Sequence, residues 1–430
     1  MKKAIICFPK INEYRWEQAQ FPIGLYKIKA YCKEKYDIKV LDERLESNIS
    51  NEIDKLLDDE VLCLGLSVMT GEQINSAIQL SRKYHGRVKI VWGGVHPTIL
   101  PKNTICEDFI DYVIQGDGEV SFLNLLEFLD KGKVQNELFL SKNNENFNIN
   151  YLDDLNKSNI DFQTEIIRDE YFVKRDGFNK AFTIETSRGC PHSCAFCHNT
   201  ILGHRYQTVE TDYVINCIKY LYIKYNIDGV IFQEDNFFGD VNRVRKIVDE
   251  LERMNYIGWK ANSRLSYFEK LSEDEKIMNK LVESHCKVLQ FGIESGSDRI
   301  LKLINKKISV RDVLLINKKL AKYSIRIRYN FIIGFPTETV DEIRMTMELV
   351  QQLIDDNPNL ENPFINIYTP YPGTPIFDLA VKQGFLPPSS LEEWAKISWN
   401  EANYTIRDEN VRNEIYCISN KFLKESNYLR

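Results

Sequence analysis

The sequence predicts an α/β protein in which two strand-and-helix domains follow one another. Short apolar runs alternate with helix-length amphipathic stretches over residues 1–140, and the alternation resumes after residue 180 with a longer period. A length of 430 residues suffices for two or three domains with ordinary cores. We therefore predict an N-terminal doubly wound parallel sheet over 1–140, a linker over 141–180, a partial (β/α)6 barrel over 181–375 and a small helical cap over 376–430.

The first domain is predicted from seven segments. The segments with the length and apolar character of buried strands are Lys3–Cys7, Ile38–Leu41, Val61–Ser67, Val88–Trp92 and Tyr112–Gln115. Helical spacing of apolar residues covers Pro22–Tyr36 and Gln73–Tyr84. Ligands of such sheets bind outside the carboxyl ends of the strands, where this chain has the glycine-bearing loops Ser67–Gly71, Gly93–Thr98 and Gly116–Glu119. Glycines let the backbone approach a large flat ligand closely.

The second domain is predicted from six strand-and-helix units. The strand-like segments are Ala181–Thr186, Gly229–Gln233, Trp259–Ser263, Val288–Ile293, Ile327–Ile333 and Phe364–Tyr368. The helix-like segments are Asp212–Tyr225, with Thr211 as its expected cap, Val241–Met254, Glu273–Ser284, Val310–Tyr323 and Val340–Ile354. Six strands suit an open barrel, whose active site lies at the carboxyl ends of the strands.

Three cysteines follow the first strand of this barrel, at Cys190, Cys194 and Cys197. Soft thiolates at such close spacing select zinc or iron–sulfur. Three thiolates are one ligand short of a closed tetrahedral zinc site, although His192 or His198 could supply a fourth. An iron–sulfur cube held by three ligands instead leaves one iron free to bind another molecule.

The spacing Cys-x3-Cys-x2-Cys, with Phe196 before the third cysteine, resembles the cluster-binding signature of the radical S-adenosylmethionine (SAM) superfamily. The resemblance implies that these cysteines hold a 4Fe-4S cluster whose open iron binds the amino and carboxylate groups of SAM. It also implies reductive cleavage of SAM to methionine and a 5′-deoxyadenosyl radical, which removes a substrate hydrogen. An electron donor such as flavodoxin or ferredoxin is then an expected partner.

The segments at the other strand ends resemble the SAM-binding motifs of that superfamily, in order. Acidic and amide oxygens suit the SAM ammonium, and a guanidinium suits its carboxylate. Each segment alone has an ordinary structural explanation, but their order after the cysteine triad favours SAM. The implied contacts are Glu234, Asp235 and Asn236 for the ammonium, Arg264 for the carboxylate, Glu294 and Ser295 for the ribose, Gly334 and Phe335 beside adenine, and Phe196 and Tyr368 around the site.

The three loops of the first domain resemble those of the cobalamin-binding domain that precedes the cluster domain in one class of radical SAM enzymes. The implied cobalamin contacts are Ser67, Met69, Thr70, Gly93, Gly94, His96, Pro97, Thr98, Gly116 and Glu119. The motif Asp-x-His-x-x-Gly is missing, because the corresponding stretch is Asp42–Ser47 without a histidine. We expect His96 to form hydrogen bonds or pack rather than ligate cobalt. A flavodoxin-like module without a ligand is the alternative.

The combined resemblance implies methylation of an unactivated substrate carbon. The second hypothesis is an enzyme that catalyses a non-methylating cyclisation, ring rearrangement or oxidation. The third hypothesis is a cobalamin- or SAM-sensing protein without turnover. The sequence names no catalytic acid or base, and it leaves open a small-molecule or a peptide substrate. Aromatic residues of the C-terminal region could shape a substrate pocket or form the core of the cap, namely Trp394, Trp399, Tyr404 and Tyr416.

Composition limits the partners and the compartment. A net charge of -6 with dispersed basic residues gives no electrostatic case for nucleic acid or an anionic membrane surface. Met1–Pro9 is too short for a signal peptide, and no apolar run approaches a membrane span. Reduced thiols and an oxygen-sensitive cluster indicate the cytoplasm of an anaerobic cell. The cysteines outside the triad are expected to be buried small hydrophobes, at positions Cys7, Cys32, Cys63, Cys106, Cys217, Cys286 and Cys417.

Overall fold

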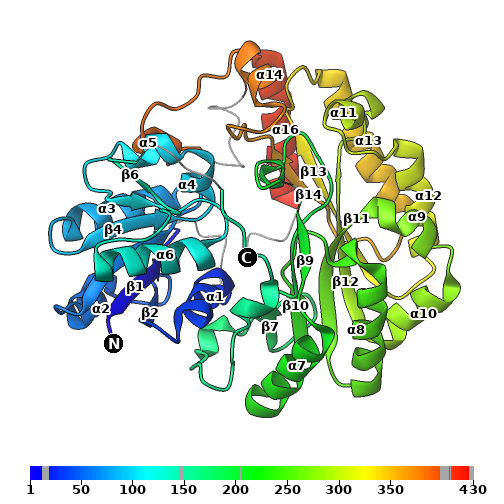
Figure 1. Cartoon of the computed structure of the whole chain (residues 1–430). Coiled ribbons are helices and arrows are strands. Elements are labelled where there is room, and N and C mark those ends of the chain that lie inside the picture. The colour runs from blue at the N-terminus through cyan, green and yellow to red at the C-terminus, as the bar shows by residue number, and fades with distance from the viewer. Residues whose placement is uncertain (12–18, 145–148, 204, 398–405, 407, 426–430) are drawn as a thin grey trace. The chain divides into compact units, whose positions relative to one another are not determined.

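The computed structural model describes residues 1–11, 19–144, 149–203, 205–397, 406 and 408–425. The chain forms two compact units (Figure 1). The first unit comprises Met1–Tyr171 and Pro388–Ser398, and the second comprises Phe172–Pro387 and Trp399–Arg430. Each unit is described by itself.

The described part of the first unit contains a six-stranded sheet in the order β2-β1-β3-β4-β5-β6. The strands are β1 (Lys3–Phe8), β2 (Asp37–Asp42), β3 (Val61–Ser67), β4 (Lys89–Gly93), β5 (Tyr112–Val113) and β6 (Leu140–Ser141). Strands β1 to β5 are parallel, and β6 pairs antiparallel at the edge. The predicted doubly wound parallel sheet is confirmed.

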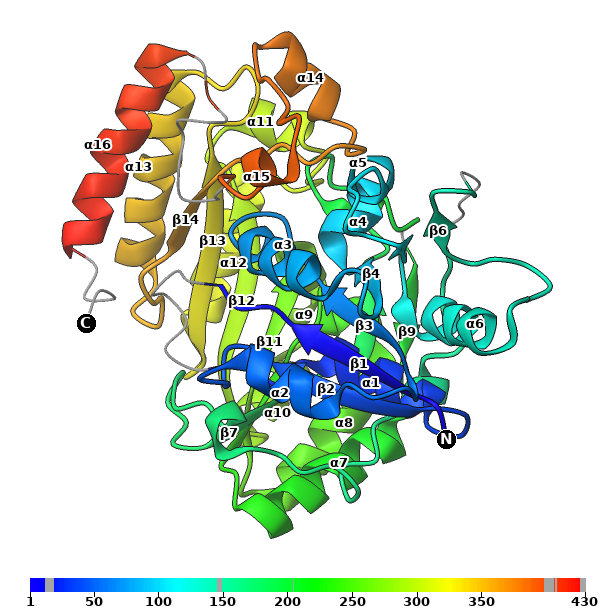
Figure 2. The same ribbon diagram turned by 90° about the vertical axis from the view of Figure 1, so that its left-hand side faces the viewer.

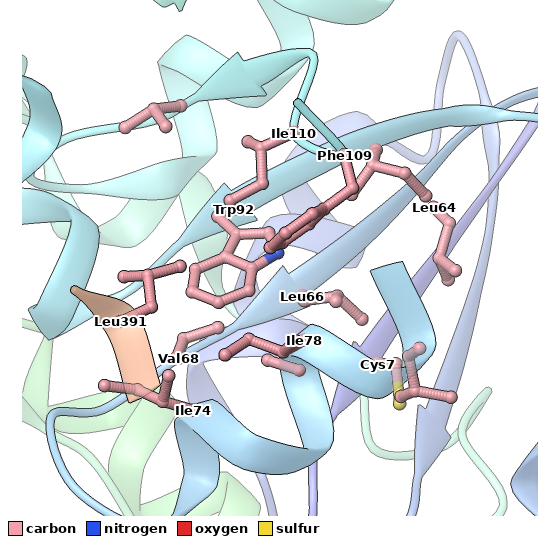
Figure 3. Packing of buried hydrophobic residues seen from close by; sticks show 14 of the residues in the cluster. Cys7, Leu64, Leu66, Val68, Ile74, Ile78, Trp92, Phe109, Ile110 and Leu391 are labelled. Carbon is pink, nitrogen blue, oxygen red and sulfur yellow. The ribbon is translucent and has the colours of Figure 1, made fainter. Parts of the chain in front are cut away.

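Helices cover both faces of this sheet, so each face has its own apolar core. The helices are α1 (Ile23–Cys32), α2 (Ile49–Leu56), α3 (Gln73–Tyr84), α4 (Val95–Ile99), α5 (Pro101–Ile105), α6 (Gly118–Lys131) and α15 (Leu391–Trp394), with the 3-10 turns η1 (Leu155–Ser158) and η2 (Asp169–Tyr171). One core joins the sheet to α2, α3 and α15, and the other joins it to α1 and α6. Trp92 lies at the centre of the first core, where its indole N–H donates to Ser81 Oγ at 2.8 Å (Figure 3).

Helices α2 and α6 are present although the sequence pattern did not predict them. Helix α2 is only eight residues long and buries Ile49 and Ile53, too few apolar positions for a clear period. Helix α6 begins at Gly118 within the loop assigned to ligand binding, and ends at Gly132 in the left-handed conformation.

Two predicted boundaries differ from the division into units. Most of the expected linker folds into the first unit, because its scattered apolar side chains, including Leu152, Leu155 and Phe162, are buried there. The expected cap is split between the units, since Trp394 packs in the first core while α14 (Phe377–Lys382) and α16 (Glu409–Glu425) belong to the second unit. Trp399 and Tyr404 lie outside the described residues.

The second unit contains a six-stranded, wholly parallel sheet among its described residues, in the order β14-β13-β12-β11-β10-β7. The strands are β7 (Ala181–Ile184), β10 (Gly229–Phe232), β11 (Gly258–Arg264), β12 (Cys286–Glu294), β13 (Arg326–Ile333) and β14 (Phe364–Ile367). This arrangement confirms the predicted partial barrel. The first strand ends two residues early, because Ser187–Gly189 forms a separate strand, β8, which pairs antiparallel with β9 (Tyr206–Thr208).

The helices of the second unit follow the strands, as the alternation predicts. They are α7 (Thr211–Tyr225), α8 (Val241–Met254), α9 (Phe268–Leu271), α10 (Glu275–Glu283), α11 (Asp298–Leu303), α12 (Val310–Leu320) and α13 (Val340–Asp356), with the 3-10 turns η3 (His198–Thr200), η4 (Phe237–Gly239) and η5 (Leu265–Tyr267). Helix α16 packs along α13 (Figure 2), where Arg344 pairs with Glu414 at 3.1 Å. The expected Thr211 cap is wrong, because Thr211 is already helical and Glu210 precedes it without a side-chain cap bond.

The buried-cysteine prediction is wrong at Cys106 and Cys417, which are exposed. Cys417 lies off the apolar face of α16 that Ile415 and Ile418 form, and Cys106 follows the end of the short helix α5. The remaining predicted positions, Cys7, Cys32, Cys63, Cys217 and Cys286, are buried. Within the described residues, no helix has both the length and the apolar character needed to cross a membrane.

Candidate active site

The cysteine triad lies on a loop that other segments of the second unit hold in place. The backbone N–H of Ala195 donates to the Ile304 carbonyl at 2.8 Å, and Ile376 N–H donates to the Ala195 carbonyl at 3.1 Å. The side-chain amide of Asn305 donates to both the carbonyl and the hydroxyl of Ser193, at 2.8 and 2.9 Å. The loop is therefore ordered by hydrogen bonds independent of the thiols.

The described residues contain no set of three His, Cys, Asp or Glu side chains that converges as the ligands of one metal ion must. His192, one of the two fourth ligands considered for zinc, instead places Nε2 3.1 Å from the Tyr267 hydroxyl. The three thiolates of an iron–sulfur cube need not converge on one point, because each thiolate binds a different iron. Burial raises the pKa of Cys197 to about 12 and also raises that of Cys190, so cluster binding must release thiol protons.

Asn236 follows strand β10 and Arg264 ends the neighbouring strand β11, and each has one buried atom without a partner among the described residues. Asn236 is 1 % exposed, and its Nδ2 donates to the Tyr267 hydroxyl at 3.2 Å while Oδ1 has no partner. Arg264 is 7 % exposed, and its Nη1 donates to Cys194 Sγ at 2.9 Å while Nη2 has no partner. Buried polar atoms are rarely left unpaired. One free acceptor and one free cationic donor fit the ammonium and carboxylate of an amino acid, which are the groups SAM presents.

Glu234 has a different environment from Asn236. Its carboxylate accepts hydrogen bonds from the backbone N–H of Thr186 at 2.8 Å and from the hydroxyls of Thr186 and Ser187, and it lies 3.8 Å from Arg243 Nη2. Both oxygens therefore hold the start of the cysteine loop. Asp235 is exposed. Of the three residues assigned to the SAM ammonium, Asn236 alone carries a buried side-chain atom without a partner in this structure.

The fourth strand ends in a strained turn at Glu294. Its φ of 79° is uncommon for a residue other than glycine, and the β12–β13 register shifts beside it. Lys306 Nζ donates to Glu294 Oε1 at 2.7 Å, and both side chains are buried. A Cβ at Gly292 would overlap that same oxygen, so a larger residue there would displace the Glu294 carboxylate. Ser295 is buried and accepts a hydrogen bond from the backbone N–H of Ser297.

Three aromatic rings form a row from the cysteine loop to the last two strand ends. The Phe196 and Phe335 centroids lie 5.7 Å apart, and those of Phe335 and Tyr368 lie 5.2 Å apart. The Tyr368 hydroxyl is buried and meets no partner in the described parts of the chain. Gly334, at φ 84°, is held by Glu338, whose carboxylate accepts the backbone N–H groups of Gly334 and Phe335 at 2.5 and 3.0 Å. The rings are tilted to one another, by 58° and 37°, so the row is an apolar aromatic wall of the kind that can pack against a base such as adenine.

In the first unit, hydrogen bonds join the three glycine-bearing loops. Val68 N–H donates to the Gly93 carbonyl at 2.8 Å, and Gly116 N–H donates to Thr98 Oγ1 at 3.1 Å. Gly94 is in the positive-φ region, and a Cβ there would lie 2.9 Å from the Val68 backbone. The predicted contacts therefore gather at one edge of the sheet. Gln115 Oε1 is buried there without a partner, an unsatisfied acceptor suited to a polar ligand group.

His96 has the environment of a packing residue. It is fully buried, its Nδ1 lies 3.1 Å from Thr70 Oγ1, and its ring meets Trp394 edge-on. Burial lowers its pKa to about 4, so the imidazole is neutral. Its Nε2 has no partner. In place of a histidine after β2 stands Arg44, which pairs with Asp42 and lies over the Phe8 ring at 4.2 Å.

The other predicted cobalamin contacts differ in exposure. Met69 is 48 % exposed, so its side chain is open to a ligand. Pro97, Thr98 and Glu119 are buried, while Ser67, Thr70, Gly93 and Gly116 are half-buried.

Five further residues shape the second-unit site although no role was predicted for them, namely Arg243, Tyr267, Asn305, Lys306 and Glu338. Glu338 lies at the end of the segment 334–338 that resembles the adenine motif, and the other four lie outside the motifs. Tyr267 offered the one usable signal, since it follows Arg264 by three residues.

Two family models match the chain. The radical SAM superfamily matches residues 184–350, and the B12 binding domain matches residues 16–126. These matches and the fold define a cobalamin-dependent radical SAM enzyme, with a 4Fe-4S cluster, SAM and cobalamin as cofactors. Within that class, the chain carries the B12 domain first and the cluster domain second.

Individual relatives agree with this assignment. An uncharacterized methyltransferase of Pyrococcus horikoshii is 28 % identical over 85 % of this chain and 79 % of its own. The anaerobic magnesium-protoporphyrin IX monomethyl ester cyclase of Rubrivivax gelatinosus is 22 % identical over 82 % of this chain and 64 % of its own. The structure of the radical SAM methyltransferase TsrM of Kitasatospora setae shares the fold, with a TM-score of 0.70 at 14 % identity over 90 % of this chain and 77 % of TsrM.

Proposed function

We propose that this enzyme transfers a methyl group to an unactivated carbon of its substrate. The cluster and SAM would supply a 5′-deoxyadenosyl radical able to remove a hydrogen that no base could take, and cobalamin would supply the methyl group. The observation that carries the proposal is the unsatisfied pair Asn236 Oδ1 and Arg264 Nη2 beside the cysteine loop, in a chain that also has a B12 domain. The methyltransferase name of the Pyrococcus relative supports the methyl step.

The proposal gives each group of residues a task. Cys190, Cys194 and Cys197 hold the cluster, while Asn236 and Arg264 bind the amino-acid end of SAM. Glu294 accepts from the ribose, and the row Phe196, Phe335 and Tyr368 packs beside adenine. The loops that end β3, β4 and β5 hold cobalamin.

The conditions of turnover follow from the chemistry. A small electron donor such as flavodoxin or ferredoxin reduces the cluster, and a reducing cytoplasm preserves it. The substrate is a small molecule or a peptide.

Anaerobic purification with added cobalamin, followed by iron and sulfide reconstitution, tests the proposal. We expect about four irons per chain, a cobalamin absorption band, and 5′-deoxyadenosine formation from SAM once a reductant is added. Alanine at each cysteine of the triad should abolish iron binding and SAM cleavage but leave cobalamin bound. Material that takes up zinc alone, or cleaves no SAM, would contradict the proposal.

A second function uses the same cofactors without methyl transfer. The similarity to a protein named as a cyclase favours a cyclisation or an oxidation. SAM carrying a trideuterated methyl group separates the two, because only methylation transfers that label to the product. A sensor without turnover would bind SAM and cobalamin but form no 5′-deoxyadenosine.

A further inference from the structure

Tyr267 links the cysteine loop to the end of β10. Its hydroxyl lies 3.1 Å from His192 Nε2 and 3.2 Å from Asn236 Nδ2. The phenol and imidazole rings also meet edge-on, with centroids 5.6 Å apart. One hydroxyl group thus joins residues from three segments that the sequence separates by 31 and 75 positions.

The orientation of the Asn236 amide in the structure sets the donor and acceptor roles in this row of hydrogen bonds. The Asn236 Nδ2 group can only donate, so the Tyr267 oxygen accepts. The Tyr267 O–H is then free to donate to His192 Nε2. This arrangement uses the His192 tautomer whose Nε2 carries no proton, and it leaves Asn236 Oδ1 on the side opposite Tyr267.

This hydrogen bonding leaves the side-chain oxygen of Asn236 available to a ligand. Within the part of the chain that the structure describes, Asn236 Oδ1 is buried without a partner, beside the loop that carries the triad. If the amide rotated by half a turn, Nδ2 would face that position and repel an ammonium group. We infer that Tyr267 is a positioning residue for SAM, which fixes the Asn236 amide so that its oxygen receives the SAM ammonium. This inference rests on the proposed function.

The test is the variant Tyr267→Phe, which keeps the ring and removes the hydroxyl. SAM binding is measured by equilibrium dialysis on anaerobic, reconstituted enzyme without reductant, so that no turnover occurs. We expect roughly three- to tenfold weaker SAM binding, the range of one lost hydrogen bond. Binding of 5′-methylthioadenosine, which lacks the amino and carboxylate groups, should be unchanged.

Tyr329→Phe is the matched control. Its hydroxyl donates to Asn317 Oδ1 at 3.0 Å in the same unit, so this variant also loses a buried bond between tyrosine and asparagine. It should bind SAM as the wild type does. The double variant Asn236→Ala with Tyr267→Phe should bind SAM no more weakly than Asn236→Ala alone, because Tyr267 acts through Asn236.

Three outcomes would overturn the inference. These are unchanged SAM binding in Tyr267→Phe, an equal loss of SAM and 5′-methylthioadenosine, and a loss of iron, which would assign the hydroxyl to holding the cluster loop through His192. Wild-type enzyme that carries a full cluster but binds no SAM would refute the proposed function instead.

Discussion

Arg264 donates a hydrogen bond from Nη1 to the sulfur of Cys194 at 2.9 Å, while its Nη2 is buried and has no partner among the described residues. The guanidinium of Arg264 therefore donates one hydrogen bond to a cysteine of the triad and keeps Nη2 available for another. This geometry places a fixed cation at the end of β11, beside the loop that carries the triad. The variant Arg264→Lys tests whether Nη2 binds the SAM carboxylate.

Arg264→Lys should weaken SAM binding by about tenfold or more, because an ammonium is a point charge and lacks the two-armed geometry of a guanidinium. Iron content should stay near the wild-type value, since the cysteines are unchanged. Dialysis against SAM, with iron determined on the same samples, checks both statements. Normal SAM affinity in this variant would remove Arg264 from the proposed site.

Glu234→Gln should act on stability rather than on SAM. The carboxylate accepts three hydrogen bonds and faces Arg243, so the amide leaves a buried guanidinium without its counter-charge. We expect about 1–3 kcal/mol less free energy of unfolding. Asn236→Ala is the contrasting variant, with weaker SAM binding and a smaller loss of stability. A large drop in SAM affinity for Glu234→Gln with unchanged stability would show that Glu234 binds SAM directly.

Gly292→Ala should displace the Glu294 carboxylate from Lys306, because the added methyl group would overlap Glu294 Oε1 and stand 3.1 Å from Lys306 Nζ. Overpacking of this kind costs about 1–3 kcal/mol. Denaturant unfolding measures the loss. Gly24→Ala, in helix α1 with open space around the added carbon, is the control and should stabilise the protein by about 0.5–1 kcal/mol. Equal effects of the two variants would contradict the steric argument.

Glu338 should make stability depend on pH. Burial raises its pKa from 4.5 to about 8 in the folded protein. A raised pKa means that the folded state binds the proton more tightly, so this contribution is complete below pH 4.5 and is lost as pH rises through 8. Wild-type Tm should therefore fall relative to Glu338→Gln between pH 5 and pH 8.5.

The neighbouring Glu342 provides the opposite sign and serves as the internal comparison. Its hydrogen bond from Arg299 lowers its pKa to about 2, so its contribution is present above pH 4.5 and is lost as pH falls toward 2. A wild-type Tm that runs parallel to that of Glu338→Gln across pH 5 to 8.5 would show that the Glu338 carboxyl is not buried as described.

The sequence by itself determined the features that depend on local patterns. Strand β3 and helices α3 and α8 have the predicted bounds, because apolar periodicity and turn residues act over a few positions. The cysteine spacing and the glycine-bearing loops could be recognised in the sequence for the same reason. Elements with weak local patterns, such as α2, were not predicted.

Only the tertiary structure decided which polar atoms are already paired. Glu234 and Asn236 are two positions apart and looked equivalent in the sequence. The Glu234 carboxylate accepts hydrogen bonds from Thr186 and Ser187, whereas Asn236 Oδ1 has no partner among the described residues. Likewise, Tyr267 meets His192 across 75 positions. Hydrogen bonds of this kind depend on where the strands bring distant segments together, which no local periodicity encodes.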